Sequence, residues 1–292
     1  MIRWPGMLGK KPQYLRGASW LHSFPTVRPL VIAHRGASGL APENTSLAVA
    51  TAIALGADMV EVDAQLSRDG HLIIFHDRTL GRTARFSTRV SRKTPRSTSI
   101  GALTLDEIRT LDAGSWRGRA FAGLGVPTLP DILAQCIGRI ALNLEIKLRA
   151  SHASDERHVI VAQLVEALRA YPASAPVLIS SSNVMVLELV RAQAPAARLG
   201  VLIKSNSGSN ASTVATALRI ADRLDAFSLH LPCAMVRPPL VNTIHRRGFR
   251  LFAYTANGIA SMRRLIAVGV DGIFTDHPER LITLLRRESN RP

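Results

Sequence analysis

The sequence predicts an α/β fold in which eight parallel strands close into a (β/α)8 barrel, with a small insertion after the hairpin that follows the second strand. From residue 30 onward, eight short β-branched runs alternate with helical patterns, which is typical of βα units around a parallel sheet. No glycine-rich phosphate-binding loop opens the first unit, which argues against an open nucleotide-binding sheet. The barrel domain is expected over residues 30–288, after an N-terminal extension of residues 1–29.

Strands and helices are expected in alternation. The strands are residues 30–33, 59–66, 140–146, 177–180, 199–203, 226–229, 251–254 and 272–274. The helices between them are residues 46–55, 159–169, 184–191, 214–222, 236–245 and 261–268. A last helix, residues 278–287, begins with proline and ends with two arginines, as helix termini prefer.

A hairpin is predicted after the second strand. The pair Asp69-Gly70 stands between two β-rich runs, which favours a tight turn. If Arg68 faces His71 across this turn, His76 lies opposite Asp63. The segment from about residue 78 to 128 is too long for an ordinary βα loop. It is expected to form a small insertion over the barrel mouth, with a short helix over residues 105–111 after Thr104 as N-cap.

The composition limits the class of protein. The chain has 292 residues and a formal net charge of +16. The basic residues are mostly arginine, which in one interpretation reflects only a GC-rich genome. In the other interpretation, the positive charge attracts anionic substrates, nucleic acid or lipid surfaces. Residues 78–100 hold seven basic side chains and no acidic one, which indicates an exposed loop. Nucleic-acid binding is not expected, because no motif beyond charge supports it and only three Trp and three Tyr are available for stacking.

Neither a disulfide framework nor a structural zinc site is expected. Cys136 and Cys233 lie outside any CxxC or Cys/His cluster, and both are expected to be small buried hydrophobes. No uncharged apolar run reaches the length of about 18 residues that a membrane-spanning helix needs. Residues 1–29 lack the apolar core and cleavage site of a secretory signal, so a cytoplasmic location is expected.

Polar side chains that are rare in barrel strands stand at the predicted C-terminal strand ends. They are His34 and Arg35 on strand one, Glu61 and Asp63 on strand two, and Glu145 and Lys147 on strand three. Because side chains alternate along a strand, Glu61 and Asp63 share one face. Three carboxylates that converge at one mouth would repel one another and lose hydration unless a cation joined them. Oxygen ligands favour one hard divalent ion, Mg2+ or Ca2+.

Two histidines beside such a cation predict cleavage of a phosphoester. His34 ends the first strand, and the hairpin returns His76 to the same mouth. One histidine would deprotonate a nucleophile while the other protonates a leaving oxygen. The cation, Arg35 and Lys147 would stabilise the oxygens of a tetrahedral anion. A structural alternative is that the acidic residues of strand two only form ion pairs with Arg35.

Six motifs, in this order, resemble the glycerophosphodiester phosphodiesterase family. They are His34-Arg35-Gly36-Ala37, Pro42-Glu43-Asn44-Thr45, Glu61-Val62-Asp63, His76-Asp77, Leu144-Glu145-Ile146-Lys147 and Gly269-Val270-Asp271-Gly272-Ile273-Phe274-Thr275-Asp276. The resemblance covers roughly residues 30 to 285 and implies a TIM-like barrel with a small insertion after His-Asp. The sequence differs from the family pattern at Tyr254, where the family often has Trp, and at Gly81, where Asp is commoner.

The resemblance also implies roles for the site residues. One divalent metal would be held by Glu61, Asp63 and Glu145, with His34 and His76 as the acid/base pair. Arg35 and Lys147 would contact the phosphate. The glycerol hydroxyl next to the phosphoester would attack phosphorus, and water would open the resulting cyclic phosphate. The expected products are glycerol 3-phosphate and an alcohol.

Further polar residues near strand ends receive lesser roles. Tyr254, Asn257 and His230 are candidate substrate contacts, together with Lys204. Asn44 or Thr45 is expected to cap the helix that begins near residue 46, and Glu43 to brace Arg35. Asp276 is expected to be a helix N-cap rather than a ligand.

Two other functions remain open from the sequence. One is a lysophospholipase D-like lipid phosphodiesterase, whose basic insertion would make transient contact with an anionic membrane surface. The other is a catalytically silent barrel that binds anions. The substrate in the main interpretation is a small glycerophosphodiester.

Overall fold

The computed structural model describes residues 28–86, 95–148, 154–170, 176–204 and 211–289. Eight parallel strands close into a barrel, because each strand pairs with the next and the last returns to the first. The strands are β1 (Leu30–His34), β2 (Met59–Leu66), β6 (Ala141–Ile146), β7 (Val177–Ser181), β8 (Arg198–Leu202), β9 (Ser228–Pro232), β10 (Arg250–Tyr254) and β11 (Gly272–Thr275). The predicted (β/α)8 barrel is therefore confirmed.

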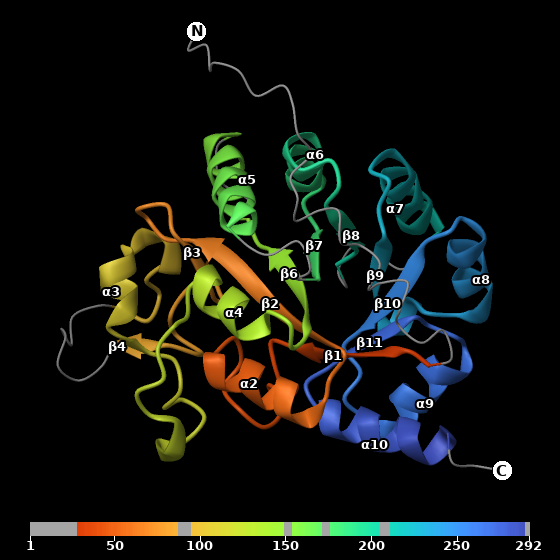
Figure 1. Cartoon of the computed structure of the whole chain (residues 1–292), viewed down its shortest axis with the longest axis horizontal. Coiled ribbons are helices and arrows are strands. Elements are labelled where there is room, and N and C mark those ends of the chain that lie inside the picture. Colours follow the sequence, from red (N-terminus) through yellow and green to blue (C-terminus); the bar gives the residue numbers. More distant parts are fainter. Residues whose placement is uncertain (1–27, 87–94, 149–153, 171–175, 205–210, 290–292) are drawn as a thin grey trace, which may run out of the picture.

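Helices surround the strands on the outside (Figure 1). They are α2 (Ser46–Leu55), α4 (Leu129–Cys136), α5 (Ser154–Arg169), α6 (Val184–Gln193), α7 (Ala211–Arg223), α8 (Pro238–Arg246), α9 (Ile259–Ala267) and α10 (Pro278–Ser289). Their buried apolar faces and the outward faces of the strands form one continuous hydrophobic core. Helix α2 begins as predicted, with the Thr45 hydroxyl accepting from the Ala48 N–H at 3.2 Å. Helix α4 was not expected from the sequence.

The hairpin after β2 exists, but its predicted register is wrong by one residue. Strand β3 (Leu72–Ile74) pairs antiparallel with β2, with Ala64 opposite Ile74. The Phe75 N–H donates to the Asp63 carbonyl at 2.8 Å, so His76 does not lie opposite Asp63. The cause is the turn. Ser67 N–H bonds to the His71 carbonyl at 2.9 Å, which closes a three-residue loop with Gly70 at a φ of +85° instead of a two-residue turn.

The insertion packs around a small core of its own. It contains β4 (Arg85–Phe86), β5 (Leu111–Asp112), α3 (Leu105–Arg109) and the 3-10 turns Ile100–Ala102 and Arg119–Phe121. Strand β3 joins the two cores, because Leu72 and Ile74 face the barrel core while Ile73 and Phe75 face that of the insertion. The insertion therefore lies beside β3, at the left of Figure 1. Thr104 caps α3 as predicted, in a capping box with Glu107.

Several smaller expectations have mixed outcomes. Cys136 is buried, as predicted, and burial raises the pKa of its thiol to about 12, whereas Cys233 is only half-buried. Residues 1–27 of the predicted N-terminal extension and residues 87–94 of the basic loop lie outside the described residues. Among the helices that the structure describes, none combines the length and apolar character needed to cross a bilayer.

Candidate active site

The strand ends surround a cavity of about 500 Å³ at the C-terminal mouth of the barrel. This is the end at which (β/α)8 barrels carry their functional residues. The lining residues are His34, Arg35, Glu61, His76, Glu145, Lys147, Leu202, Lys204, Tyr254, Thr255 and Phe274. One side of the cavity is thus charged and comes from β1, β2, β3 and β6, whereas β8, β10 and β11 contribute an apolar and aromatic side with Lys204 at its edge.

Three carboxylates converge on the charged side, as predicted. Oxygen atoms of Glu61, Asp63 and Glu145 all lie within 4.8 Å of one another. Register explains the grouping, since β2 and β6 pair in parallel with Asp63 beside Glu145. Glu61 and Asp63 are each only 1% exposed. Burial and the repulsion of Asp63 and Glu145 raise the pKa of Glu61 well above its ordinary value.

Two cations neutralise part of this negative charge. Lys147 Nζ lies 3.1 Å from Asp63 Oδ1 and 2.9 Å from a Glu145 oxygen. Arg35 Nε lies 3.3 Å from Asp63 Oδ2. Burial alone would raise the pKa of Asp63, but Lys147 and Arg35 outweigh it and hold this pKa below its ordinary range. Burial disfavours the charged form of Lys147, yet the carboxylates beside it raise the pKa of its ammonium group.

The negative charge of Glu61 is compensated less than that of Asp63, because burial and the two neighbouring carboxylates outweigh the effect of Arg35 and Lys147. Its Oε2 accepts the Arg35 backbone N–H at 2.8 Å. Its buried Oε1 has no hydrogen-bond partner among the residues that the structure describes. The simple ion-pair alternative therefore accounts for Asp63 but not for Glu61. A buried carboxylate oxygen without a partner, beside two further carboxylates, is a donor set that fits a hard divalent cation.

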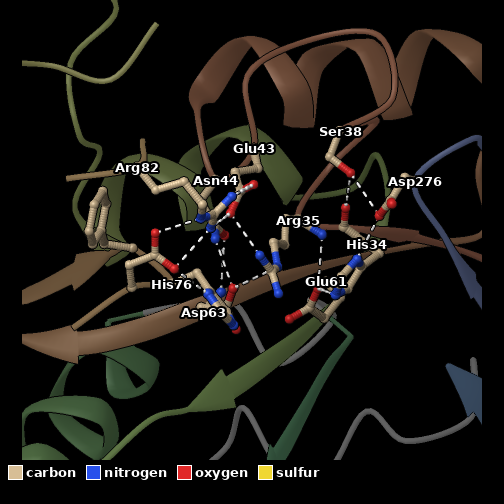
Figure 2. A network of polar contacts seen from close by, with 12 residues as sticks. His34, Arg35, Ser38, Glu43, Asn44, Glu61, Asp63, His76, Arg82 and Asp276 are labelled. Atoms are coloured by element: carbon tan, nitrogen blue, oxygen red, sulfur yellow. Dashed lines mark hydrogen bonds and ion pairs between the residues drawn. The ribbon is translucent and has the colours of Figure 1, made fainter. Parts of the chain in front are cut away.

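His34 is held by a carboxylate from the last strand end. Its Nδ1 lies 2.7 Å from Asp276 Oδ1, which leaves Nε2 on the side of Glu61, 4.0 Å from Oε2 (Figure 2). Asp276 also accepts hydrogen bonds from Ser38 at 3.0 Å and from Asn257 at 2.6 Å. Burial raises the pKa of Asp276, but the hydrogen bond with His34 outweighs it, and the pKa lies below the ordinary range. An ionised carboxylate only accepts, so Nδ1 carries the proton.

The N-cap expected of Asp276 is therefore wrong. Its carboxylate orients His34 from across the barrel closure, where β11 pairs with β1. This contact joins residues far apart in sequence, which is why the sequence did not reveal it. Asn257, expected to contact substrate, lies behind it: its amide nitrogen donates to Asp276 and its oxygen accepts the Asp276 N–H at 2.9 Å.

His76 is held in a similar way by its sequence neighbour. His76 Nδ1 lies 2.8 Å from Asp77 Oδ1, and His76 lines the cavity. Asp77 in turn accepts from Arg82 Nε at 2.7 Å. Burial raises the pKa of Asp77, but its hydrogen bonds with His76 and Arg82 lower it below the ordinary range, so His76 Nδ1 is the donor. Both predicted histidines thus lie in the cavity, each with one ring nitrogen fixed by an aspartate.

The other predicted residues divide into two groups. Tyr254 and Lys204 line the cavity, and the Tyr254 hydroxyl donates to the Ile203 carbonyl. His230 was expected near a strand end, and this placement is wrong. Strand β9 continues to Pro232, three residues beyond the predicted end, so His230 lies within the strand and inside the barrel. It is fully buried, its Nε2 lies 2.9 Å from the Ser228 hydroxyl, and burial lowers the pKa of its imidazole to about 3.

Glu43 and Asn44 support the site from the loop after β1. Glu43 accepts from Arg35 at 2.7 Å, which confirms the predicted brace. The Asn44 side chain bonds to Asp63 twice, donating to Oδ2 at 2.8 Å and accepting the backbone N–H at 3.1 Å. Asn44 thereby fixes one of the three carboxylates, whereas the helix cap comes from Thr45.

Comparison with known proteins identifies the family. The model of the glycerophosphoryl diester phosphodiesterase family matches residues 34–280. The chain belongs to this family. The match runs from the end of β1 to the start of α10, so it includes the insertion and all the residues that line the cavity. As a member of the glycerophosphoryl diester phosphodiesterase family, the chain is a hydrolase of the phosphodiesterase class.

Individual members of the family are similar to this chain over nearly their whole length. A glycerophosphodiester phosphodiesterase from Caldanaerobacter subterraneus subsp. tengcongensis is 37% identical, over 89% of this chain and 99% of the relative. The structure of an Oleispira antarctica phosphodiesterase, in complex with the product sn-glycerol-3-phosphate, is similar with a TM-score of 0.78 and 30% identity, covering 91% of this chain and 98% of the other. A glycerophosphodiester phosphodiesterase from Agrobacterium tumefaciens reaches a TM-score of 0.68 at 25% identity, covering 87% and 99%.

Proposed function

We propose that this enzyme hydrolyses glycerophosphodiesters to sn-glycerol 3-phosphate and an alcohol, with one divalent cation, Mg2+ or Ca2+, and with His34 and His76 as the acid/base pair. One observation carries the proposal. One cavity is lined by the carboxylates of Glu61 and Glu145, by the cations Arg35 and Lys147, and by two histidines whose Nδ1 atoms are fixed by aspartates. The buried carboxylate of Asp63 completes the acidic cluster. The product named for the Oleispira antarctica structure supports the choice of substrate class.

The carboxylates of Glu61, Asp63 and Glu145 would hold the cation. When bound, it supplies Lewis-acid stabilisation of the phosphoryl oxygens. Arg35 and Lys147 already neutralise Asp63 and lie at the cavity wall, so they can bind the remaining phosphate oxygens. Binding of a phosphodiester between these cations would offset the net negative charge of the substrate.

The histidines move protons at opposite ends of the reacting phosphate. One ring nitrogen accepts the proton of the glycerol hydroxyl next to the phosphoester, and this oxygen bonds to phosphorus. The other histidine donates a proton to the alcohol oxygen as its bond to phosphorus breaks. In the second step the roles reverse, and water opens the cyclic phosphate. Asp276 and Asp77 keep the two rings oriented throughout.

Release of sn-glycerol 3-phosphate from glycerophosphocholine tests this function. We expect release with Mg2+ or Ca2+, complete loss with a chelator, and recovery when the ion is restored. Release that persists in the chelator would contradict the carboxylate site as a metal centre. No release with either ion, from glycerophosphocholine or from other glycerophosphodiesters, would contradict the substrate class. Lysophospholipids would then test the lipid phosphodiesterase alternative, and inactivity on these too would favour the silent barrel.

Cation binding is expected to strengthen as the pH rises. Burial and the neighbouring carboxylates raise the pKa of Glu61 above its usual value of 4.5. At pH values below this raised pKa, cation binding therefore displaces a proton from the Glu61 carboxyl group. A bound cation favours the ionised form, and affinity therefore falls as the pH is lowered through the raised pKa. Calorimetric titrations in two buffers with different protonation enthalpies would count the released protons. Binding that releases no proton and does not change with pH would contradict this role for Glu61.

A further inference from the structure

Arg82 connects two carboxylates that lie on different elements of the structure. The residue belongs to the insertion, and its guanidinium group donates to both oxygens of Glu43 at 2.7 Å. The same group donates to both oxygens of Asp77, from Nε at 2.7 Å and from Nη2 at 2.9 Å. Figure 2 shows Arg82 on the outer side of the network, between Glu43 and the His76 branch.

Each of these carboxylates holds a residue of the cavity. Glu43 accepts from Arg35 Nη1 at 2.7 Å, and Asp77 lies 2.8 Å from His76 Nδ1. Arg82 thus contacts the carboxylate that holds Arg35, the proposed phosphate-binding residue, and the carboxylate that holds His76, a proposed acid/base residue. Arg35 comes from the end of β1 and His76 from the chain after β3, and Arg82 hydrogen-bonds to the carboxylate that holds each of them.

The charges of the network are matched. Hydrogen bonds to Glu43 and Asp77 raise the pKa of Arg82. Burial raises the pKa of Glu43, but the hydrogen bond from Arg82 and the charge of Arg35 lower it below its usual value. The Arg82 side chain is 47% exposed, and ion pairs that are this exposed to solvent contribute little to stability. Arg82 therefore contributes mainly by positioning its partners. The planar guanidinium group holds two carboxylates in a fixed geometry at once, because its N–H donors point in set directions, whereas an ammonium group is a point charge on a flexible stem.

We infer that Arg82 is a positioning residue of the active site, which fixes His76 through Asp77 and Arg35 through Glu43. This inference rests on the proposed function, because it assumes that His76 moves a proton and that Arg35 binds the phosphate. It gives the insertion, which contributes no lining residue to the cavity in the part of the chain that the structure describes, a role in the reaction. The two branches have different kinetic consequences, and substitutions can separate them.

Kinetics of four variants and a control test the inference. Arg82→Gln is expected to lower kcat and raise KM together. Asp77→Asn should lower mainly kcat, and Glu43→Gln should raise mainly KM. Because a positioned acid/base group contributes roughly 10²- to 10⁴-fold to a rate, we expect Arg82→Gln to lower kcat by about 10- to 100-fold. Arg82→Lys should have kcat and KM values close to those of Arg82→Gln, because lysine keeps the positive charge but lacks the planar guanidinium group. Arg85→Gln, at an exposed arginine of the same insertion, is the control and should match the wild type.

A double variant distinguishes positioning from general support of the fold. If Arg82 acts on kcat through Asp77, adding Arg82→Gln to Asp77→Asn should lower kcat little further. If the two losses multiply in full, or if Arg85→Gln loses as much activity, the inference is wrong.

A spectroscopic measurement tests the same point without the reaction. In 15N spectra of the histidine rings, Arg82→Gln should change the signals of His76 and leave those of His34, which Asp276 holds. Unchanged His76 signals would overturn the inference even in an active enzyme. If the wild type cleaves no glycerophosphodiester, the proposed function fails, while these spectra still decide whether Arg82 orients His76.

Discussion

Glu61→Gln is expected to lower the affinity for the divalent cation strongly and to lower the rate of hydrolysis by roughly 10²- to 10³-fold. The substitution keeps the shape of the side chain, so the Arg35 N–H at 2.8 Å retains an oxygen acceptor. What is lost is the negative charge of the oxygen that has no hydrogen-bond partner among the described residues. Calorimetric titration with Mg2+ and Ca2+ and the release of sn-glycerol 3-phosphate would be measured on the same samples.

The sign of the stability change separates this effect from unfolding. The raised pKa of Glu61 means that the folded protein without cation disfavours the ionised carboxylate. A neutral glutamine removes that unfavourable charge, so the Tm without cation should equal or exceed that of the wild type at neutral pH. Added cation should then raise the Tm of the wild type only. The control is Glu166→Gln, at an exposed glutamate of α5. Wild-type cation affinity in Glu61→Gln would show that another group holds the ion.

His76→Gln is expected to lower kcat by roughly 10²- to 10⁴-fold while cation affinity stays at the wild-type level. His76 lines the cavity, and its Nδ1 is held by Asp77. It is not one of the candidate metal ligands, which are the three carboxylates of Glu61, Asp63 and Glu145. Glutamine keeps a hydrogen-bonding side chain but does not exchange protons near neutral pH. Single-turnover assays at saturating substrate would measure the loss.

A matched control for this variant lies on the same hairpin. His71 is also a histidine, its side chain is 54% exposed, and it is not among the residues that line the cavity. His71→Gln should therefore keep full activity. If cation binding disappears in His76→Gln, then His76 is a ligand and its role has been misassigned. If both variants lose activity equally, the hairpin as a whole is responsible.

The barrel and the charged side of its mouth were predictable because they depend on local patterns. Short β-branched runs and helical periodicity identified all eight strands, with ends displaced by up to three residues. Side-chain alternation then placed Glu61 and Asp63 on one face, and the parallel register of β2 and β6 placed Glu145 beside them. The displaced end of β9 had a larger effect, because it decided whether His230 lay at the mouth or in the buried interior.

The hairpin shows how one backbone angle changes a prediction. The Asp69-Gly70 pair signalled a turn, but the loop length depends on which residue adopts the left-handed conformation. Gly70 occupies that conformation at the third position of the loop, and every pair along β2 and β3 moves by one residue. His76, one residue beyond the hydrogen bond between the Phe75 N–H and the Asp63 carbonyl, still lines the cavity.

The sequence by itself determined the barrel, the insertion and the set of acidic, basic and histidine residues at its mouth, because strand and helix periodicities and residue chemistry are local properties. Only the tertiary structure showed how those residues are held. Asp276 reaches His34 because β11 closes the barrel against β1, and Arg82 reaches Glu43 because the insertion packs on β3. Such contacts join residues 242 and 39 positions apart, and they depend on barrel closure and on core packing, which no local pattern encodes.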